Sequence, residues 1–507
     1  MAALRPSRPS VRSSRDQWLV VAAVTSVALL ARLLPVLRGG RLDGVYGYDD
    51  GVYYTAAASL LAGRAPYAHF TLLHPPGIVL LLAPFAMLGR FTSDHVGIAA
   101  ARLGFMALGA VNAGLISTLG ARLARHVGAP IAVAAVGGVF YALWYSSIYA
   151  TRTTLLEGLG SFSLLLAIAF VWPVGPPTER AATLAGAALA FGACTKIWGL
   201  VPAIVVAAWV WRRFCRGLAV RLVASGVVLA VLVCGPFLAL APTAMPRMVL
   251  LDQIGRPRTT RSPIARALDA SSLRWNVPSL TGAAATLVLS ALVLLLILVC
   301  VVAWRSQGEL PVLLLAATSL TLVLSPTYFT HYGEFVAAPL ALVLTGAAST
   351  WAVRARRLGP LRLPVVVPIV ALVLLELPTQ VKPMGSAIDA ARLRTAVATA
   401  RCVTTETPSM LAITDSLTRS LHAGCQVPVD LTGSVYDTMR QLGPNGRVVP
   451  RLHNTRYQQH LVQYLMDADA QVLVQPARKV LDARGLQELH RNRLALAEGS
   501  LRVYRRG

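Results

Sequence analysis

The sequence predicts an all-α polytopic membrane protein that carries a small α/β domain at its C-terminal end. Only 14% of the 507 residues are charged, whereas a soluble globular protein has about 25%. Apolar runs of roughly 18 to 25 residues recur up to residue 380, and each is long enough to cross about 30 Å of hydrocarbon as a helix. Beyond residue 380 the chain becomes polar, which marks the start of a separate terminal domain.

The apolar runs predict about eleven membrane-spanning helices. They fall near residues 17–37, 96–120, 129–148, 155–172, 181–195, 198–211, 217–240, 279–303, 311–327, 334–351 and 362–379. One N-terminal signal peptide cannot account for so many runs. The run 77–89 is short for a span and follows two prolines. We expect it to form a helix that lies at the membrane surface or inserts only partly.

The charge distribution predicts on which side of the membrane each end of the chain lies. With residues 1–16 as a cytoplasmic basic tail, sixteen arginines fall on the cytoplasmic side and only three acidic residues oppose them. These arginines are Arg5, Arg8, Arg12, Arg15, Arg122, Arg125, Arg180, Arg212, Arg213, Arg216, Arg221, Arg305, Arg354, Arg356, Arg357 and Arg362. Cytoplasmic loops are enriched in arginine and lysine. We therefore expect a multi-pass plasma-membrane protein with its N-terminus inside and its C-terminus outside.

Positive loops also explain the net charge of +25, so we expect membrane lipids and not nucleic acid as partners. Residues 381–507 are expected to form the extracytoplasmic α/β domain, because strand-like runs alternate there with helical patterns. The segments are 410–413, 455–468, 471–474 and 478–491. No glycine-rich phosphate loop opens a helix in this domain, so no chemistry is assigned to it. Cys402 and Cys425 can pair if the domain lies outside the cytosol.

Two adjacent carboxylates, Asp49 and Asp50, lie in the polar stretch 38–76 that follows the first span. A carboxylate at a membrane surface can take the proton of an attacking hydroxyl. Neighbouring carboxylates repel each other, which raises the pKa of one of them. The alternative interpretation is a solvated pair or a helix cap, a position that aspartate favours.

Basic residues gather on the side of the membrane that is expected to be outside. They are His74, Arg152, Lys196, His331 and, in the loop 243–277, Arg247, Arg256, Arg258, Arg261, Arg266 and Arg274. Arginines on an outer loop oppose the usual charge bias, so an anionic group such as a phosphate is their expected partner. Lipid headgroups or acidic residues of the terminal domain are the alternative partners.

Arg152 and Glu157 lie near the outer mouth of a predicted span, where ionisable groups usually face a cavity. A simple ion pair between them is equally compatible with the spacing. Tyr53 belongs to a tyrosine-rich loop, and such rings either stack on sugars or anchor the chain at the membrane interface. A carboxylate base opposite a cluster of cations suits transfer of a group from a lipid-carried phosphate to a hydroxyl, because fixed cations stabilise the leaving phosphate.

The outer loop 38–95 resembles the first outer loop of the protein O-mannosyltransferase-like enzymes of glycosyltransferase family 39, which have the GT-C fold. The resemblance rests on Asp49-Asp50-Gly51-Val52-Tyr53-Tyr54 followed by His74-Pro75-Pro76-Gly77. Further similar stretches are Thr151-Arg152 with Glu157, Thr195-Lys196, and His331-Tyr332 ahead of Pro339. The resemblance extends over residues 17–380, which are accordingly expected to form a GT-C-like catalytic domain of the actinobacterial type.

The resemblance implies inverting transfer of a sugar, most often mannose, from a polyprenyl-phosphate donor to an acceptor hydroxyl on the outer face. Asp49 matches the catalytic acidic residue and would act as the general base. Asp50, where the family usually has Glu, is given a supporting role. His74 matches a residue near the donor phosphate, and Lys196 and His331 match positions on the lipid-phosphate side. The chain lacks the large outer domain of eukaryotic protein mannosyltransferases, so lipid, glycan, peptide and protein acceptors all stay open.

A transporter or flippase of a lipid-linked sugar is the main alternative. Transporters usually hold charged groups within their spans and often contain an inverted repeat, whereas these spans are almost free of charge and show no repeat. The sequence predicts no certain cofactor beyond the lipid-linked donor as substrate, and a divalent metal ion remains possible.

Overall fold

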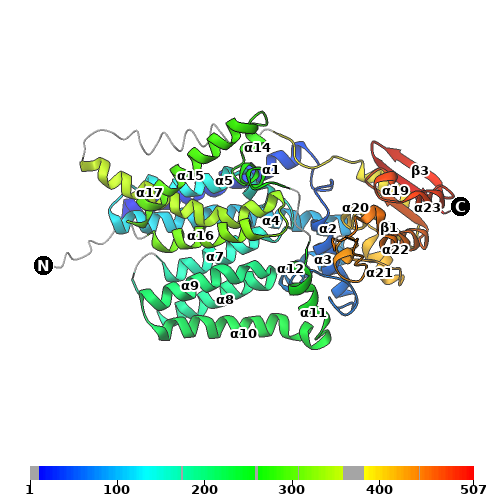
Figure 1. The fold of residues 1–507 in the computed structure, drawn as a ribbon, viewed down its shortest axis with the longest axis horizontal. Coiled ribbons are helices and arrows are strands. Elements are labelled where there is room, and N and C mark those ends of the chain that lie inside the picture. The colour runs from blue at the N-terminus through cyan, green and yellow to red at the C-terminus, as the bar shows by residue number, and fades with distance from the viewer. Residues whose placement is uncertain are drawn as a thin grey trace.

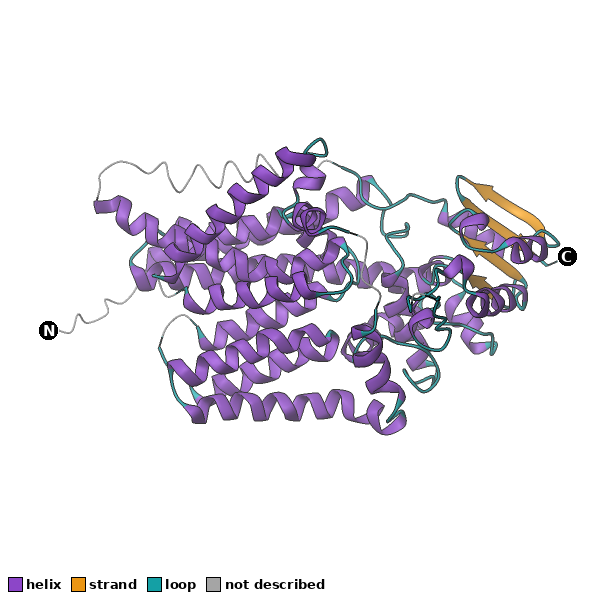
Figure 2. Ribbon diagram, viewed as in Figure 1, coloured by secondary structure: helices purple, strands orange, loops and turns teal. Residues whose placement is uncertain are grey.

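The computed structural model describes residues 11–172, 175–256, 261–305, 308–357, 382–444 and 446–506. The expected span at 362–379, residues 1–10 of the tail and Arg258 lie outside these described residues. Figure 1 shows a bundle of long helices at one end and a small sheet domain at the other. Figure 2 shows that the strands are confined to the sheet domain.

Each expected span that falls on described residues coincides with a helix. The helices are α1 (Val11–Arg38), α4 (Asp94–Val127), α5 (Ala134–Leu143) with α6 (Tyr145–Thr151), α7 (Glu157–Val171), α8 (Glu179–Thr195), α9 (Leu200–Arg213), α10 (Arg216–Leu240), α15 (Gly282–Trp304), α16 (Glu309–Leu324) and α17 (Glu334–Arg357). In the described part, five helices are long and apolar enough to cross a membrane, or six if α5 and α6, which meet at 61°, form one span. Four further expected spans, α7, α8, α9 and α16, are shorter than 18 residues, and the eleventh lies outside the described residues.

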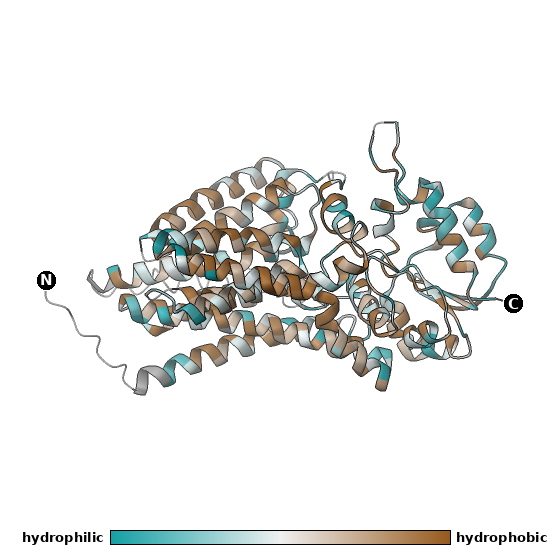
Figure 3. Ribbon diagram, turned by 90° about the horizontal axis from the view of Figure 1, so that it is seen from below, coloured by the Kyte–Doolittle hydropathy of each residue, from teal (hydrophilic) through white to brown (hydrophobic). Residues whose placement is uncertain are grey.

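The helix surfaces match a membrane environment. Val228, Val231 and Leu232 on α10 and Leu294 and Ile297 on α15 are each more than half exposed. Exposed apolar side chains of this size on the outer helices of the bundle fit contact with lipid tails. Figure 3 shows the apolar colouring of the bundle against the more polar sheet domain. The protein is therefore a polytopic membrane protein, as its composition predicts.

Two shorter helices, α2 (Asp49–Leu61) and α3 (Gly77–Phe91), lie between the bundle and the sheet domain (Figure 1). The helix expected at 77–89 is confirmed as α3. Helix α2 was not expected, because residues 50–59 are all buried and therefore show no amphipathic period. Gly51 of α2 approaches the backbone of Ser409 so closely that a Cβ there would clash. This contact presses the first turn of α2 against the terminal domain.

The loop 243–277 consists of short helical turns. They are α11 (Ala244–Pro246), a π-helical turn (Arg247–Leu251), α12 (Asp252–Ile254), α13 (Pro263–Ala270) and α14 (Leu273–Asn276). Single 3₁₀ turns, Ile131–Val133, Ile197–Gly199 and Thr330–Gly333, precede α5, α9 and α17. The Ile197–Gly199 turn reverses the chain between α8 and α9. Gly199 is required there, because a Cβ would lie 2.6 Å from the Ala193 nitrogen.

The terminal domain contains a four-stranded sheet of order β1-β2-β4-β3. Its strands are β1 (Val403–Thr405), β2 (Ala470–Leu473), β3 (Arg493–Glu498) and β4 (Leu501–Arg505). Strands β1 and β2 are parallel, with Val403 opposite Ala470. Strand β4 is antiparallel to both β2 and β3, with Val472 opposite Val503. The expected strand at 471–474 is thus confirmed as β2.

The helices of this domain are α19 (Ala390–Val397), α20 (Ser409–Ile413), α21 (Leu417–His422), α22 (Thr455–Met466) and α23 (Ala483–Leu489), with 3₁₀ turns at Gly433–Tyr436, Arg451–His453 and Ala477–Lys479. The helix expected at 455–468 is confirmed as α22. The helix expected at 478–491 begins later, because the Asp482 side chain caps α23 by accepting a hydrogen bond from the Gly485 nitrogen. The strand expected at 410–413 is wrong. This short run is buried on every side, and such runs cannot be distinguished as strand or helix by pattern.

The terminal domain is docked onto α2, α3 and α4. Val52, Leu72, Met410 and Val472 belong to one buried apolar cluster that continues from these helices into the sheet. Asp94 at the start of α4 accepts a 2.9 Å hydrogen bond from the Thr418 nitrogen. His95 lies 2.8 Å from Asp415. The pairing of Cys402 with Cys425 is confirmed, and it joins the start of β1 to the segment after α21.

Candidate active site

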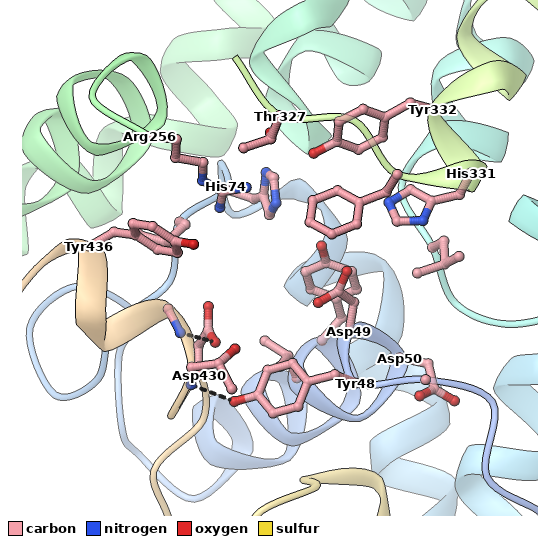
Figure 4. A pocket seen from close by; sticks show the side chains of 18 of the residues that line it. Tyr48, Asp49, Asp50, His74, Arg256, Thr327, His331, Tyr332, Asp430 and Tyr436 are labelled. Atoms are coloured by element: carbon pink, nitrogen blue, oxygen red, sulfur yellow. Dashed lines mark hydrogen bonds between the residues drawn. The ribbon is translucent and has the colours of Figure 1, made fainter. Parts of the chain in front are cut away.

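A cavity of about 730 Å³ lies where the helix bundle meets the terminal domain. Ten of the residues that the sequence singles out line it, although they come from distant parts of the chain (Figure 4). They are Asp49, Asp50, Tyr53, His74, Glu157, Lys196, Arg256, Arg261, His331 and Tyr332. The fold therefore gathers most of the motifs that the sequence singles out into one space.

Asp49 opens helix α2, and its carboxylate faces the cavity (Figure 4). Within the described residues this half-buried carboxylate makes no hydrogen bond and no ion pair. Burial raises the pKa of Asp49 above its ordinary value, while the nearby His331 and Arg256 side chains oppose that shift. A carboxylate with free lone pairs and raised basicity is suited to accept a proton from a bound hydroxyl.

Asp50 differs from its neighbour, because its carboxylate is buried and fully engaged. Its Oδ2 lies 2.6 Å from the guanidinium of Arg102 and accepts a 2.9 Å hydrogen bond from Thr153. Its Oδ1 accepts a 2.9 Å hydrogen bond from the Gly51 nitrogen. Arg102 also donates to the carbonyl oxygens of Leu42 and Gly44. Asp50 thus fixes the start of α2 against α4, and Asp49 is left as the available carboxylate.

Lys196 forms a charged corner at the junction of α8 and α9. Its Nζ lies 2.5 Å from Glu157 Oε1, and His331 Nε2 lies 3.7 Å from the same oxygen. The ammonium group also lies over the rings of Trp198 and Tyr332, at 4.2 and 3.9 Å from their centroids. Glu157 therefore pairs with Lys196 and not with Arg152. One ammonium group, one imidazole and one carboxylate therefore share this corner.

His74 reaches the same corner because α3 begins against the end of α8. A Cβ on Gly77 would lie 2.6 Å from the Cys194 carbonyl oxygen, so only glycine allows this approach. The His74 ring meets the Tyr53 ring edge-on, with centroids 5.8 Å apart. Burial lowers the pKa of His74 well below its ordinary value, and the charge of Lys196 lowers it further. We therefore expect a neutral imidazole that can donate one hydrogen bond.

Arg256 supplies a further cation from the segment that follows α12. Its guanidinium lies over the ring of Tyr436, 5.3 Å from the centroid. Its Nε has no hydrogen-bond partner among the described residues. Figure 4 shows Arg256 beside His74 at the edge of the cavity. Both groups are placed where they can contact an anionic ligand.

Other arginines of the predicted cationic group are engaged elsewhere. Arg247 pairs with Asp437 of the terminal domain at 2.7 Å, and Arg261, which also lines the cavity, pairs with Asp269 at 3.0 Å. Arg152 does not line the cavity, because its guanidinium stacks on Tyr149 at 3.7 Å and donates to a backbone carbonyl. Acidic partners within the chain thus account for Arg247 and Arg261.

The terminal domain forms the wall that sequence reasoning missed. It contributes Asp430, Thr432, Gly433, Val435, Tyr436, Val448, Val449, Pro450, Arg451 and Gln475. No local signal in the sequence singles out Asp430, because it follows an ordinary apolar run. Arg102 was also missed, although an arginine inside an expected span is a recognisable signal of a buried partner. Among the described residues, no group of three or more His, Cys, Asp or Glu side chains is arranged to hold a metal ion.

No protein-family model matches the chain, and no curated protein matches it. Solved structures do share its fold. ArnT from Cupriavidus metallidurans in the apo state matches with a TM-score of 0.61 and 13% identity, over 97% of this chain and 98% of that chain. The same protein bound to undecaprenyl phosphate matches with a TM-score of 0.50 and 14% identity, over 96% and 97%. The oligosaccharyltransferase of Archaeoglobus fulgidus tethered with an acceptor peptide matches with a TM-score of 0.54 and 10% identity, over 90% and 68%.

These likenesses define a class. The chain has the GT-C fold of membrane glycosyltransferases, the fold that the resemblance of its outer-loop motifs implies. At identities of 10 to 14% they define the fold and not the substrate.

Proposed function

We propose that this protein is a glycosyltransferase that moves a sugar, mannose in the first instance, from a polyprenyl-phosphate donor to an acceptor hydroxyl. Asp49 acts as the general base, and Asp50 holds the start of α2 in place. The observation that carries the proposal is that one cavity holds both a carboxylate and a group of basic side chains. A carboxylate without a hydrogen bond among the described residues lies in the same space as Lys196, His331, His74 and Arg256.

The chemistry needs one base and one set of cations. The acceptor oxygen attacks the anomeric carbon while its proton passes to the Asp49 carboxylate. The bond between the anomeric carbon and the phosphate oxygen breaks, and its electron pair leaves with the phosphate. Lys196, His331 and Arg256 stabilise the negative charge that develops there, so the leaving group needs no proton. Attack from the face opposite the phosphate inverts the anomeric centre, and a β-linked donor gives an α-linked product.

The comparisons support a lipid-phosphate donor by analogy, since one structure of this fold is bound to undecaprenyl phosphate. The alternative, a transporter or flippase of a lipid-linked sugar, is not favoured by these neighbours. We also propose that the cavity and the terminal domain lie on the extracytoplasmic side of the plasma membrane. The Cys402–Cys425 disulfide supports this orientation, because disulfides persist in oxidising compartments.

The test is a transfer assay with the full chain in lipid nanodiscs and radiolabelled polyprenyl-phosphate mannose. Lipid, cell-wall glycan and peptide fractions are screened separately for incorporation of label. We expect label in one fraction and release of polyprenyl phosphate in equal amount. No transfer from mannosyl or other hexosyl donors, together with no binding of undecaprenyl phosphate, would contradict the proposal. Labelling of single cysteines placed in residues 400–507 tests the orientation, and their protection from impermeant reagents in intact cells would overturn it.

A further inference from the structure

The wall that the terminal domain gives to the cavity differs in character from the wall opposite. The bundle side contributes Lys196 and His331, whereas the terminal domain contributes Asp430, Tyr436 and Gln475 together with Arg451. Figure 4 shows Asp430 and Tyr436 at one side of the cavity and His331 with Tyr332 at the other. The two walls are therefore suited to different parts of a bound complex.

The Asp430 carboxylate is held rigidly at the cavity surface. Its Oδ1 accepts a 2.7 Å hydrogen bond from the Gly433 nitrogen. A Cβ at position 433 would displace the Asp430 carboxylate, so glycine there allows the carboxylate to keep this place. The Tyr48 hydroxyl beside Asp430 accepts a 2.8 Å hydrogen bond from the Thr432 nitrogen, which ties this turn to the start of α2. A carboxylate offers about four acceptor positions, so fixing Oδ1 leaves acceptor capacity for a ligand.

Gln475 is held by a second buried carboxylate. The nitrogens of Val474 and Gln475 donate to Glu406 Oε1 at 2.7 and 2.8 Å. This bond fixes the turn after β2, from which Gln475 reaches the cavity. Asp430 and Gln475 therefore come from separate, independently anchored turns that converge on one space. Such anchoring reduces the entropy that is lost when a ligand binds.

We propose that this wall is the acceptor subsite and that the acceptor is a carbohydrate, with Asp430 accepting hydrogen bonds from two neighbouring hydroxyls of the acceptor sugar. The proposal rests on the proposed function and names the substrate class of the same site. Gln475 donates to a further hydroxyl, and the face of Tyr436 that does not carry the Arg256 guanidinium packs against the sugar ring.

The wall is less suited to an extended peptide. One common way to bind an extended peptide is to pair its main chain with a free strand edge. Among the described residues, no residue of β1 to β4 lines the cavity. The wall instead offers the Asp430 carboxylate and the Tyr436 ring beside apolar side chains and Arg451, and a sugar with several adjacent hydroxyls can use these groups together.

The test measures binding of two probes to the full chain in nanodiscs without turnover. Octyl glycosides of mannose, glucose and galactose report on the acceptor subsite, and undecaprenyl phosphate reports on the donor side. We expect the wild type to bind at least one octyl glycoside saturably. Asp430→Asn keeps the acceptor for the Gly433 nitrogen but removes the charge. It should weaken binding of that glycoside about 10- to 100-fold and leave binding of undecaprenyl phosphate unchanged, since a hydrogen bond to a charged group contributes about 1.5–3 kcal/mol.

Single deoxy versions of the glycoside identify the hydroxyls involved. Removing either hydroxyl that contacts Asp430 should weaken binding to the wild type but not further weaken binding to Asp430→Asn. Asp467→Asn, on the exposed surface of the same domain, is the control and should bind both probes normally. The proposal is overturned if no octyl glycoside binds the wild type, if Asp430→Asn binds the glycoside as tightly as the wild type does, or if Asp430→Asn loses affinity for both probes. A wild type that binds glycosides but not undecaprenyl phosphate would instead contradict the proposed function.

Discussion

Oδ2 of Asp50 lies 2.6 Å from the guanidinium of Arg102, and both side chains are almost completely buried. Asp49, the adjacent residue, has no such partner among the described residues and faces the cavity. Two chemically identical neighbours therefore have different environments, because helix α2 turns one toward α4 and the other toward open space. We therefore assign a structural role to Asp50 and the role of general base to Asp49.

Asp50→Asn should destabilise the fold. Removing one partner of a buried ion pair leaves the other charge uncompensated, which costs about 3–5 kcal/mol. We expect a clear loss in the free energy of unfolding, seen as a lower Tm of the purified protein in detergent. Asp49→Asn is the matched control and should stay within about 1 kcal/mol of wild type, because it breaks no ion pair among the described residues. Equal stability of Asp50→Asn and wild type would show that the Arg102 pair does not hold α2.

Lys196→Ala should weaken use of the donor. A charge-assisted contact to phosphate contributes about 1.5–3 kcal/mol, so donor KM should rise about 10- to 100-fold. Lys479→Ala removes the same group from the exposed surface of the terminal domain and should change nothing. Competition by undecaprenyl phosphate measures the effect directly. An unchanged inhibition constant for Lys196→Ala would remove this lysine from the donor site.

The pH dependence of kcat/KM should report on Asp49. Burial raises the pKa of this carboxyl, and a general base must be deprotonated. Activity should therefore rise with pH through a limb that lies above the ordinary aspartate value. The charge of Arg256 holds the Asp49 pKa down, so Arg256→Gln should move that limb to higher pH. A limb that moves to lower pH in this variant would contradict the assigned electrostatics.

Glu406 should make the stability of the protein depend on pH. Burial raises its pKa from 4.5 to about 7. The folded state thus binds the proton more tightly. The resulting contribution to the free energy of unfolding is complete below pH 4.5 and is lost as pH rises through about 7. Glu406→Gln keeps the acceptor and removes the charge. Relative to wild type, its free energy of unfolding should be higher by up to about 3 kcal/mol at pH 8 and unchanged at pH 4.5. A loss that grows with pH would contradict this prediction.

The sequence predicts the positions of the bundle helices well, because uninterrupted apolar runs admit few other structures in a membrane. It also identifies the ionisable residues that the bundle side contributes to the cavity, since such groups are rare enough in this part of the chain to be noticed. Helix α2 and helix α20 were missed for the opposite reason. Both are buried on all sides, so neither shows a period from which its secondary structure could be recognised.

The far wall of the cavity could not be predicted. Asp430 lies about 380 positions from Tyr48 in the sequence, yet the Thr432 nitrogen bonds to the Tyr48 hydroxyl. Only docking of the terminal domain brings these segments together. Likewise, spacing alone does not reveal that Arg256 faces the cavity while Arg247 pairs with Asp437. Such choices depend on the tertiary fold.

The central claim is that Asp49 is the general base, and turnover of Asp49→Asn tests it most directly. The variant keeps the size of the side chain and should bind undecaprenyl phosphate within about twofold of wild type. Single-turnover transfer from radiolabelled polyprenyl-phosphate mannose to the acceptor found in the labelling screen is then measured. We expect the rate to fall about 10²- to 10⁴-fold, the usual contribution of a positioned base. Near-wild-type transfer by well-folded Asp49→Asn would contradict the account.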